Sequence, residues 1–508
     1  MPETSSPSPF GRLFRRKELD ALAAEASAQP GATSLQRALG LLELIALGIG
    51  AVVGAGIFAS IGSAAAGDAG RPGAGPAIVL SFLLTGVACS FAALCYAEMA
   101  SMIPAAGSAY TYAYATLGEL VAWIIGWDLL LEYAVGNVAV AISWSDYLQT
   151  FLRTALGVTL PAWLGTAPLA APCALLHAAP HVGGVPIVLN LPAVAVTALL
   201  TWILVLGVKE SSRFNTLMVG VKLLVVAFFV AVAIPAFDPA NWFPPGETKW
   251  EGFAPNGLRG ILTGASIIFF AYIGFDAVST AAEETREPRR TMPLGLLGSL
   301  AICTAIYVAV AVALTGLLPA RELGVADPLA LALERKGMGW ASAIVALGAV
   351  VATTSVLLAF QLGQPRIFYS MSRDGLLPAW FARVHPRYRT PHVTTILCGL
   401  FVAFFAAFLP IADVLDLTNI GTLFAFALVC GGVLVLRYTD PHRHRPFRAP
   451  AIWATAPLGI ACCVALMSGL PEVTWKRFGV WLAAGLVLYL GGTVAYPHLV
   501  ARGSGVRS

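Results

Sequence analysis

The chain has 508 residues, of which 58% are hydrophobic and only 11% are charged. A soluble core of this size would carry more charges, so the composition places the chain among proteins with several membrane-spanning segments. The formal net charge of +4 comes mostly from short loops, as membrane topology requires, which argues against a nucleic-acid partner. The eight cysteines indicate neither a disulfide framework nor a zinc site, and we expect no cofactor.

Apolar runs of about twenty residues or more predict an all-α integral membrane protein with twelve transmembrane helices. We place these spans at about 42–66, 76–103, 117–149, 191–209, 214–236, 257–282, 293–318, 338–370, 392–411, 414–436, 450–470 and 476–499. Lys and Arg concentrate before the first span and in the loops after spans six, eight and ten. Positive residues favour the cytoplasmic side, so we expect cytoplasmic tails at 1–40 and 501–508. We expect the protein to lie in a cell inner membrane or plasma membrane.

The first span contains a glycine-rich stretch, GIGAVVGAGIF, at residues 48–58. Gly50, Gly54 and Gly56 remove Cβ atoms where the backbone would leave helical geometry. The N–H groups freed around Gly54 need an acceptor inside the bilayer, and a bound carboxylate would supply one. Close helix packing by small residues is the alternative explanation of the same glycines.

A second interrupted segment, IIFFAYIGFDAVS, lies at residues 267–279 in the sixth span, where Gly274 and Asp276 break the apolar run. Discontinuous helices one and six are typical of an inverted repeat of five helices followed by five. We therefore divide the chain into a first repeat at 41–236, a second repeat at 237–436, and two further helices at 437–500.

Several motifs together resemble the amino acid-polyamine-organocation (APC) superfamily, and more narrowly a bacterial form of its cationic amino acid transporter family. They are GAVVGAGIF, CYAEMASMIPAAGSAYTY, GWDLLLEYAVG, FFAYIGFDAVSTAAEETREPRRTMP, QLGQPRIFYSMSRDGLLP and RPFRAP, and the resemblance covers about residues 35–500. It implies a leucine-transporter-type fold and amino acid transport. The chain departs from the animal members in lacking an extra C-terminal pair of spans.

The resemblance implies a substrate site at the two breaks. Backbone N–H groups of Gly54, Ala55 and Gly56 would bind the α-carboxylate of an amino acid. Carbonyl groups near Val52, Phe270, Ala271 and Ile273 would bind its α-ammonium group, and we expect Phe270 and Phe360 to form pocket walls. The spans contain no combination of nucleophile, base and orienting group, so we expect a protein that is not an enzyme.

Lys222 is the only Lys or Arg deep within a span. An ammonium group there is costly unless it is paired or deprotonated. A structural salt bridge with Glu132 is one interpretation. The other is proton coupling by Lys222, because the resembling family carries a lysine here where sodium-coupled relatives bind their ion. Asp128 and Asp276 are further polar candidates, and Glu132 is the second candidate for proton coupling.

Charged residues near the cytoplasmic face are expected to form exposed ion pairs and an inner gate: Glu98, Glu283, Glu284, Arg286, Arg366 and Arg373. The sequence favours proton-coupled uptake of small or apolar neutral L-amino acids by alternating access. It leaves open a transporter of arginine or lysine, an amino acid exchanger, and a membrane sensor without transport. The expected partners are the amino acid, protons and the lipid bilayer, and the sequence does not tell whether a small single-span membrane subunit accompanies the chain.

Overall fold

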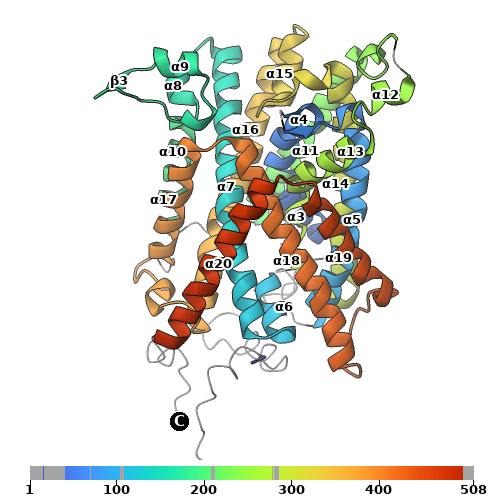
Figure 1. Cartoon of the computed structure of the whole chain (residues 1–508), viewed down its shortest axis with the longest axis vertical. Coiled ribbons are helices and arrows are strands. Elements are labelled where there is room, and N and C mark those ends of the chain that lie inside the picture. Colours follow the sequence, from blue (N-terminus) through green and yellow to red (C-terminus); the bar gives the residue numbers. More distant parts are fainter. Residues whose placement is uncertain are drawn as a thin grey trace, which may run out of the picture.

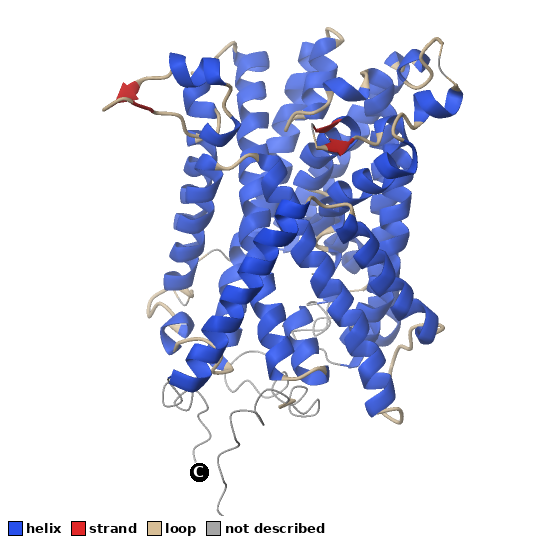
Figure 2. Cartoon of the chain, viewed as in Figure 1, coloured by secondary structure: helices blue, strands red, loops and turns tan. Residues whose placement is uncertain are grey.

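A computed structural model describes residues 15–16, 40–68, 70–102, 108–207, 212–246, 248–276, 278–279, 285–388 and 390–495. Nearly all regular structure in these residues is helical (Figure 2). The long helices run between two ends of the molecule (Figure 1). We call the end that carries α8, α9, α12 and α15 the upper face, and the end where α20 (Glu472–Ala495) stops the lower face. The all-α prediction is confirmed.

The main helices follow the chain in this order: α3 (Leu41–Val52), α4 (Ile61–Ala66), α5 (Ile78–Met102), α6 (Ser108–Thr116), α7 (Glu119–Leu156), α10 (Leu191–Leu206), α11 (Ser212–Ala233), α13 (Gly257–Ile268), α14 (Pro288–Leu317), α16 (Gly339–Arg373), α17 (His392–Phe408), α18 (Ile411–Thr439), α19 (Ile452–Ser468) and α20 (Glu472–Ala495). Short helices at the upper face are α8 (Ala162–Gly165), α9 (Cys173–Ala178), α12 (Lys249–Phe253) and α15 (Pro328–Arg335). Two small hairpins pair β1 (Gly67–Asp68) with β2 (Arg71–Pro72), and β3 (His181–Val182) with β4 (Val185–Pro186).

Six helices of the described chain are each long and apolar enough to cross a membrane, namely α5, α7, α11, α14, α16 and α18. The pair made of α3 and the segment 56–66 passes the same test with a bend of 42°. α10 and α17 are shorter apolar helices, and α19 meets α20 at an angle of 116°. Each predicted span overlaps one or more of the main helices given above.

The outside of the bundle is apolar where it would face lipid. Leu199, Leu224, Phe404 and Val487 are each more than half exposed. A soluble protein seldom leaves so many large apolar side chains in water, so these surfaces suit a hydrocarbon environment. The interior is built around α7, which packs against α16 and α18. The two broken segments cross the bundle beside these helices.

Candidate functional site

The first predicted break is present. α3 ends at Val52, and Val53 has an extended backbone with ψ of 100°. The chain resumes as a π-helical turn at Gly56–Ser60 and continues into α4. The glycine-rich stretch therefore interrupts the span inside the bundle, where Val52, Val53 and Ala55 are all buried.

The second predicted break is also present. α13 ends at Ile268 and passes into a 3₁₀ turn, Phe269–Tyr272, after which Ile273 is extended. Gly274 follows with φ of +110°, a conformation that favours glycine. A Cβ atom at Gly274 would lie 2.8 Å from the carbonyl oxygen of Ala51, so this glycine also permits close approach to the first broken span.

The glycines of the first break bring the two broken segments into contact. A Cβ atom on Gly56 would lie only 2.2 Å from the Cα of Ala271. A Cβ atom on Gly54 would lie 2.5 Å from Cγ2 of Val356 in α16. Close packing therefore explains these two glycines directly. It is compatible with the predicted role of their N–H groups, because the Cβ and N–H directions of a residue differ.

The carbonyl groups that end α3 are satisfied by side chains from other helices. Lys222 of α11 donates a hydrogen bond from Nζ to the Gly50 carbonyl at 2.8 Å. The hydroxyl of Tyr307 in α14 lies 2.9 Å from the Val52 carbonyl and 2.8 Å from the Ala271 carbonyl. A hydroxyl has one proton, so the carbonyls of the two breaks share a single donor. Sequence reasoning missed Tyr307, because a tyrosine in an apolar span resembles ordinary packing.

The carbonyl groups that end α13 are satisfied in a similar way. Asn419 of α18 donates from Nδ2 to the carbonyls of Ser266 at 2.8 Å and Ile267 at 3.0 Å. Asn419 is fully buried. Sequence reasoning also missed this residue, since its acceptors lie about 150 positions away in the chain.

The backbone polarity of the breaks suits a zwitterion. Within the described chain, the N–H groups of Gly54, Ala55 and Gly56 make no backbone hydrogen bond. They begin a helical segment, and such ends attract carboxylates. α3 and α13 approach the breaks from opposite faces with their carbonyl ends, which attract an ammonium group (Figure 1). The arrangement can therefore hold both charged ends of an α-amino acid.

The predicted wall residues lie around the breaks. Phe270 and Ile273 are 5% and 4% exposed. Phe360 of α16 packs against Tyr133 of α7, with ring centroids 5.4 Å apart, and approaches Gly136 one turn further along α7. Val356, which meets Gly54, lies one turn before Phe360 in the same helix. The structure thus brings the first break and the Phe360 wall together.

The alternative interpretation of Lys222, a salt bridge with Glu132, does not match the structure. The ammonium group of Lys222 binds the Gly50 carbonyl instead. Glu132 is 3% exposed and lies beside Thr422 of α18. Its ionisable neighbours are Asp128 and Asp276. A carbonyl at the end of a helix is an alternative partner for a buried ammonium group, which the charge pattern alone did not reveal.

The expected exposed ion pair of Glu98 is also wrong. Glu98 is completely buried at the lower face and accepts hydrogen bonds from Arg437 at 2.7 and 2.8 Å and from the Ala449 N–H at 2.8 Å. Arg445 lies 3.3 Å from the same carboxylate. Glu98 therefore fixes the RPFRAP loop to α5 and α18, while Arg286, Arg366 and Arg373 are exposed. Glu283 and Glu284 lie outside the described residues.

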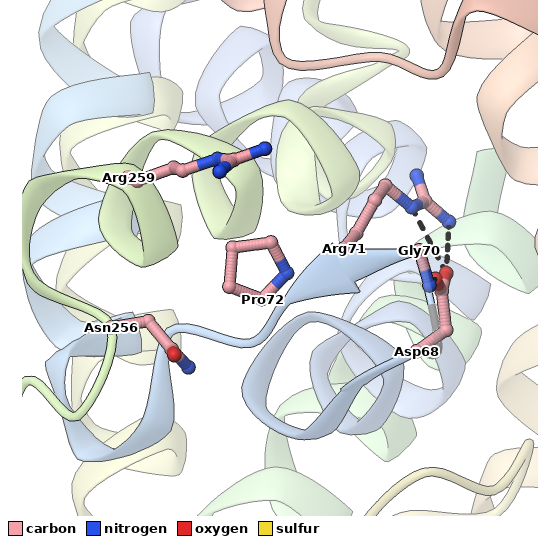
Figure 3. A pocket seen from close by; sticks show the side chains of 6 residues that line it. All are labelled: Asp68, Gly70, Arg71, Pro72, Asn256 and Arg259. Atoms are coloured by element: carbon pink, nitrogen blue, oxygen red, sulfur yellow. Dashed lines mark hydrogen bonds and ion pairs between the residues drawn. The ribbon is translucent and has the colours of Figure 1, made fainter.

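A charged pocket of about 330 Å³ lies at the upper face, where the β1–β2 hairpin meets α13 (Figure 3). Arg71 bonds to Asp68 at 2.8 Å and to Asp416 of α18 at 2.7 Å. Burial alone would raise the pKa of Asp68, but hydrogen bonds from Arg71 and from the Gly70 N–H hold that pKa below its ordinary value. The ion pairs connect the upper end of the first broken span to α18.

Comparison with known proteins agrees with this architecture. An amino acid permease family model matches residues 39–486. The chain is 44% identical over 480 residues to the branched-chain amino acid permease BcaP of Bacillus subtilis, covering 94% of this chain and 97% of the relative. It is 42% identical over 477 residues to the methylthioribose transporter of the same organism, with the same coverage. It is 38% identical over 430 residues to the vacuolar cationic amino acid transporter 4 of Arabidopsis thaliana, covering 84% of this chain and 68% of the relative. The chain therefore belongs to the amino acid permease family of the APC superfamily, and it is a multi-pass membrane transporter of amino acids, not an enzyme.

Proposed function

We propose that the protein takes up small or apolar neutral L-amino acids together with protons, by alternating access. The observation that carries the proposal is the contact between Lys222 and the Gly50 carbonyl, because it places a titratable group on the broken end of α3. The family match supports the transport of amino acids, and the name of the branched-chain relative supports an apolar substrate.

The membrane orientation and the inverted repeat belong to the same proposal. The distribution of Lys and Arg supports a cytoplasmic lower face, with both termini in the cytoplasm. Two half-helices that enter the bundle from opposite faces support repeats at 41–236 and 237–436. α19 and α20 then lie outside the repeats.

The substrate would lie between the breaks. Its carboxylate binds the N–H groups of Gly54, Ala55 and Gly56. Its ammonium group binds carbonyls among Val52, Phe270, Ala271 and Ile273, two of which share the Tyr307 hydroxyl in this structure. The side chain packs against Phe270 and Phe360, which offer hydrocarbon and no charge.

Proton coupling follows from the strength of the Lys222 contact. A hydrogen bond from a charged donor contributes about 1.5–3 kcal/mol, against about 0.5–1.5 kcal/mol for a neutral pair. The ammonium group also opposes the negative end of the α3 dipole. Deprotonation weakens this attachment, so α3 can move away from α11 and open the site to the cytoplasm. The proton then leaves with the substrate, and sodium has no part in the cycle.

One observation favours a second candidate, a transporter of arginine or lysine. Glu132, Asp128 and Asp276 lie near one another. Glu132 and Asp128 are one and two turns along α7 from Gly136, which Phe360 approaches. Carboxyl groups there could receive a distal cation. Competition for leucine binding separates the candidates, because arginine should compete as well as leucine only in the second case.

Uptake of labelled leucine into proteoliposomes tests the coupling. The parent protein should transport faster with acid outside and should not respond to sodium. Lys222→Met should lose the pH dependence, and Lys222→Arg, which stays charged, should bind leucine but turn over slowly. Lys249→Met is the matched control, because this lysine lies exposed in α12 and should change neither property.

The coupling proposal would be refuted if Lys222→Met uptake followed the outside pH as the parent's does. The proton would then be carried by another group, with Glu132 the next candidate. If the parent protein does not bind leucine, the substrate assignment is rejected instead.

A further inference from the structure

One amide side chain, that of Asn419, donates hydrogen bonds to two carbonyls at the end of α13. The last carbonyl groups of a helix have no partners within the helix, and buried carbonyls without donors are costly. At this end, the Ala265 carbonyl receives the Phe269 N–H and the Thr85 hydroxyl. The next two carbonyls, those of Ser266 and Ile267, each receive a hydrogen bond from Asn419, and the Phe269 N–H also bonds to the Ile267 carbonyl.

The same relation holds at the first break. Lys222 contacts Gly50, two residues before α3 ends, and Asn419 contacts Ser266, two residues before α13 ends. α11 is the last helix of the first proposed repeat, and α18 is the last helix of the second. In each proposed repeat, a buried side chain of the fifth helix thus bonds to the carbonyl end of the half-helix that begins that repeat.

The two side chains differ in one chemical property, since a lysine titrates and an amide does not. We propose that Asn419 is the positioning residue of the second break, holding the carbonyls of Phe270 and Ala271 in place for the substrate ammonium group regardless of proton binding. This inference rests on the proposed function. It assigns the proton-sensitive movement to the first break alone. The second break keeps its position when the proton binds or leaves.

The hydrogen bonding of Asn419 fits this role. Its Nδ2 atom makes both contacts, whereas its Oδ1 atom has no partner within the described chain. A buried acceptor without a partner costs free energy, so the contribution of the side chain lies in its two N–H donors. Ionisable groups that face this part of α18 are Asp128 and Glu132 from α7, Asp276 from the second broken span, and Asp416 with Arg71 from the upper face.

The first test is equilibrium binding of leucine to Asn419→Leu in detergent. Two carbonyls at the break each lose the hydrogen bond from Asn419, so the dissociation constant should rise by about tenfold or more. Asn137→Leu is the matched control, because this amide is equally buried in α7 and makes no hydrogen bond within the described chain. It should change the constant by less than about twofold. Equal losses in the two variants would overturn the inference.

The second test uses Asn419→Asp, which keeps the size of the side chain. An ionised carboxylate cannot donate and repels the carbonyls of Ser266 and Ile267, whereas a protonated carboxyl group donates one hydrogen bond. In the Lys222→Met background, binding should be independent of pH, and adding Asn419→Asp should make it stronger in acid. A general packing role would not create this dependence.

The two tests have separate failures. If the double variant binds leucine equally at all pH values, Asn419 does not position the second break, and the inference is overturned while the proposed function stands. If the parent protein binds neither leucine nor arginine, the proposed function fails, and the inference falls with it. Asn419→Ser, which keeps one donor, should bind with intermediate affinity and guards against variants that do not fold.

Discussion

The contact between Gly56 and Ala271 predicts a large effect for the smallest possible substitution. In Gly56→Ala, the new methyl group would lie 2.2 Å from Cα, 2.7 Å from Cβ and 2.8 Å from N of Ala271, whereas ordinary contacts are 3.4–4 Å. The neighbouring atoms belong to the backbone of the second break, so the two broken segments must separate by about 1 Å or more.

Overpacking of a tight core costs about 1–3 kcal/mol, and we expect the upper end of this range because a backbone must move. Leucine binding should fall with stability, since the carbonyls of the two breaks would no longer converge. Gly54→Ala should be milder, because its methyl group meets only the side chain of Val356, and Val356→Ala should relieve it. No truncation of a neighbouring side chain can relieve Gly56→Ala, because its methyl group meets the backbone of Ala271.

Thermal unfolding in detergent, with and without leucine, measures both effects. Gly220→Ala in α11 is the control, because a Cβ atom there meets nothing within 4 Å, and alanine should stabilise the helix by up to about 1 kcal/mol. Parental stability and binding in Gly56→Ala would refute the close packing of the two breaks. The same geometry means that lost binding in a bulky Gly54 variant does not by itself prove a carboxylate clamp.

Two further substitutions test particular polar contacts. Tyr307→Phe removes the donor shared by the two breaks, so the free energy of unfolding should fall by about 1–3 kcal/mol, and leucine should raise the unfolding temperature more than in the parent protein. Asp327, before α15 at the upper face, accepts a hydrogen bond from the Thr150 hydroxyl, and burial raises its pKa to about 6. The folded protein therefore holds this proton more tightly than the unfolded chain, and stability should be lost as the pH rises from about 4 through 6. Asp327→Asn should abolish that loss, which unfolding temperatures across this range would show.

Both breaks could be predicted from sequence because their signal is local. Glycines at 54, 56 and 274 interrupt apolar runs, and an interrupted run reports backbone geometry without knowledge of distant residues. The depth of Lys222 could be predicted for the same reason, since it depends only on distance from the end of a span. These features position most of the candidate site.

The partners of these features could not be predicted, because they depend on packing between distant segments. Tyr307 reaches a carbonyl 255 positions away, and nothing in its neighbourhood distinguishes it from a packing residue. Glu98 looked like a surface residue at a span end, but arginines more than 330 positions away cover it. A salt bridge between Lys222 and Glu132 was one interpretation because opposite charges suggest a pair, whereas the carbonyl end of α3 binds the ammonium group without carrying a formal charge.

The position of Glu132 allows a direct test of substrate charge. A leucine side chain buried against Phe270 and Phe360 gains about 1.5–3 kcal/mol, so leucine should bind about ten- to a hundredfold more tightly than glycine. An arginine side chain would have to bring its cation to Glu132, which lies beside Thr422 of α18. Burying that cation without a partner would cost more free energy than burial of the hydrocarbon part of the arginine side chain would gain.

Glu132→Gln keeps the size of the side chain but removes the charge that a cation would need. If the substrate is neutral, equilibrium binding of leucine should change by less than about threefold, and arginine should compete poorly before and after the substitution. Asp128→Asn, one turn away on α7, is the control for a general change of polarity. A parent protein that binds arginine as tightly as leucine, and loses only arginine in Glu132→Gln, would show that the carboxyl group selects a cationic substrate.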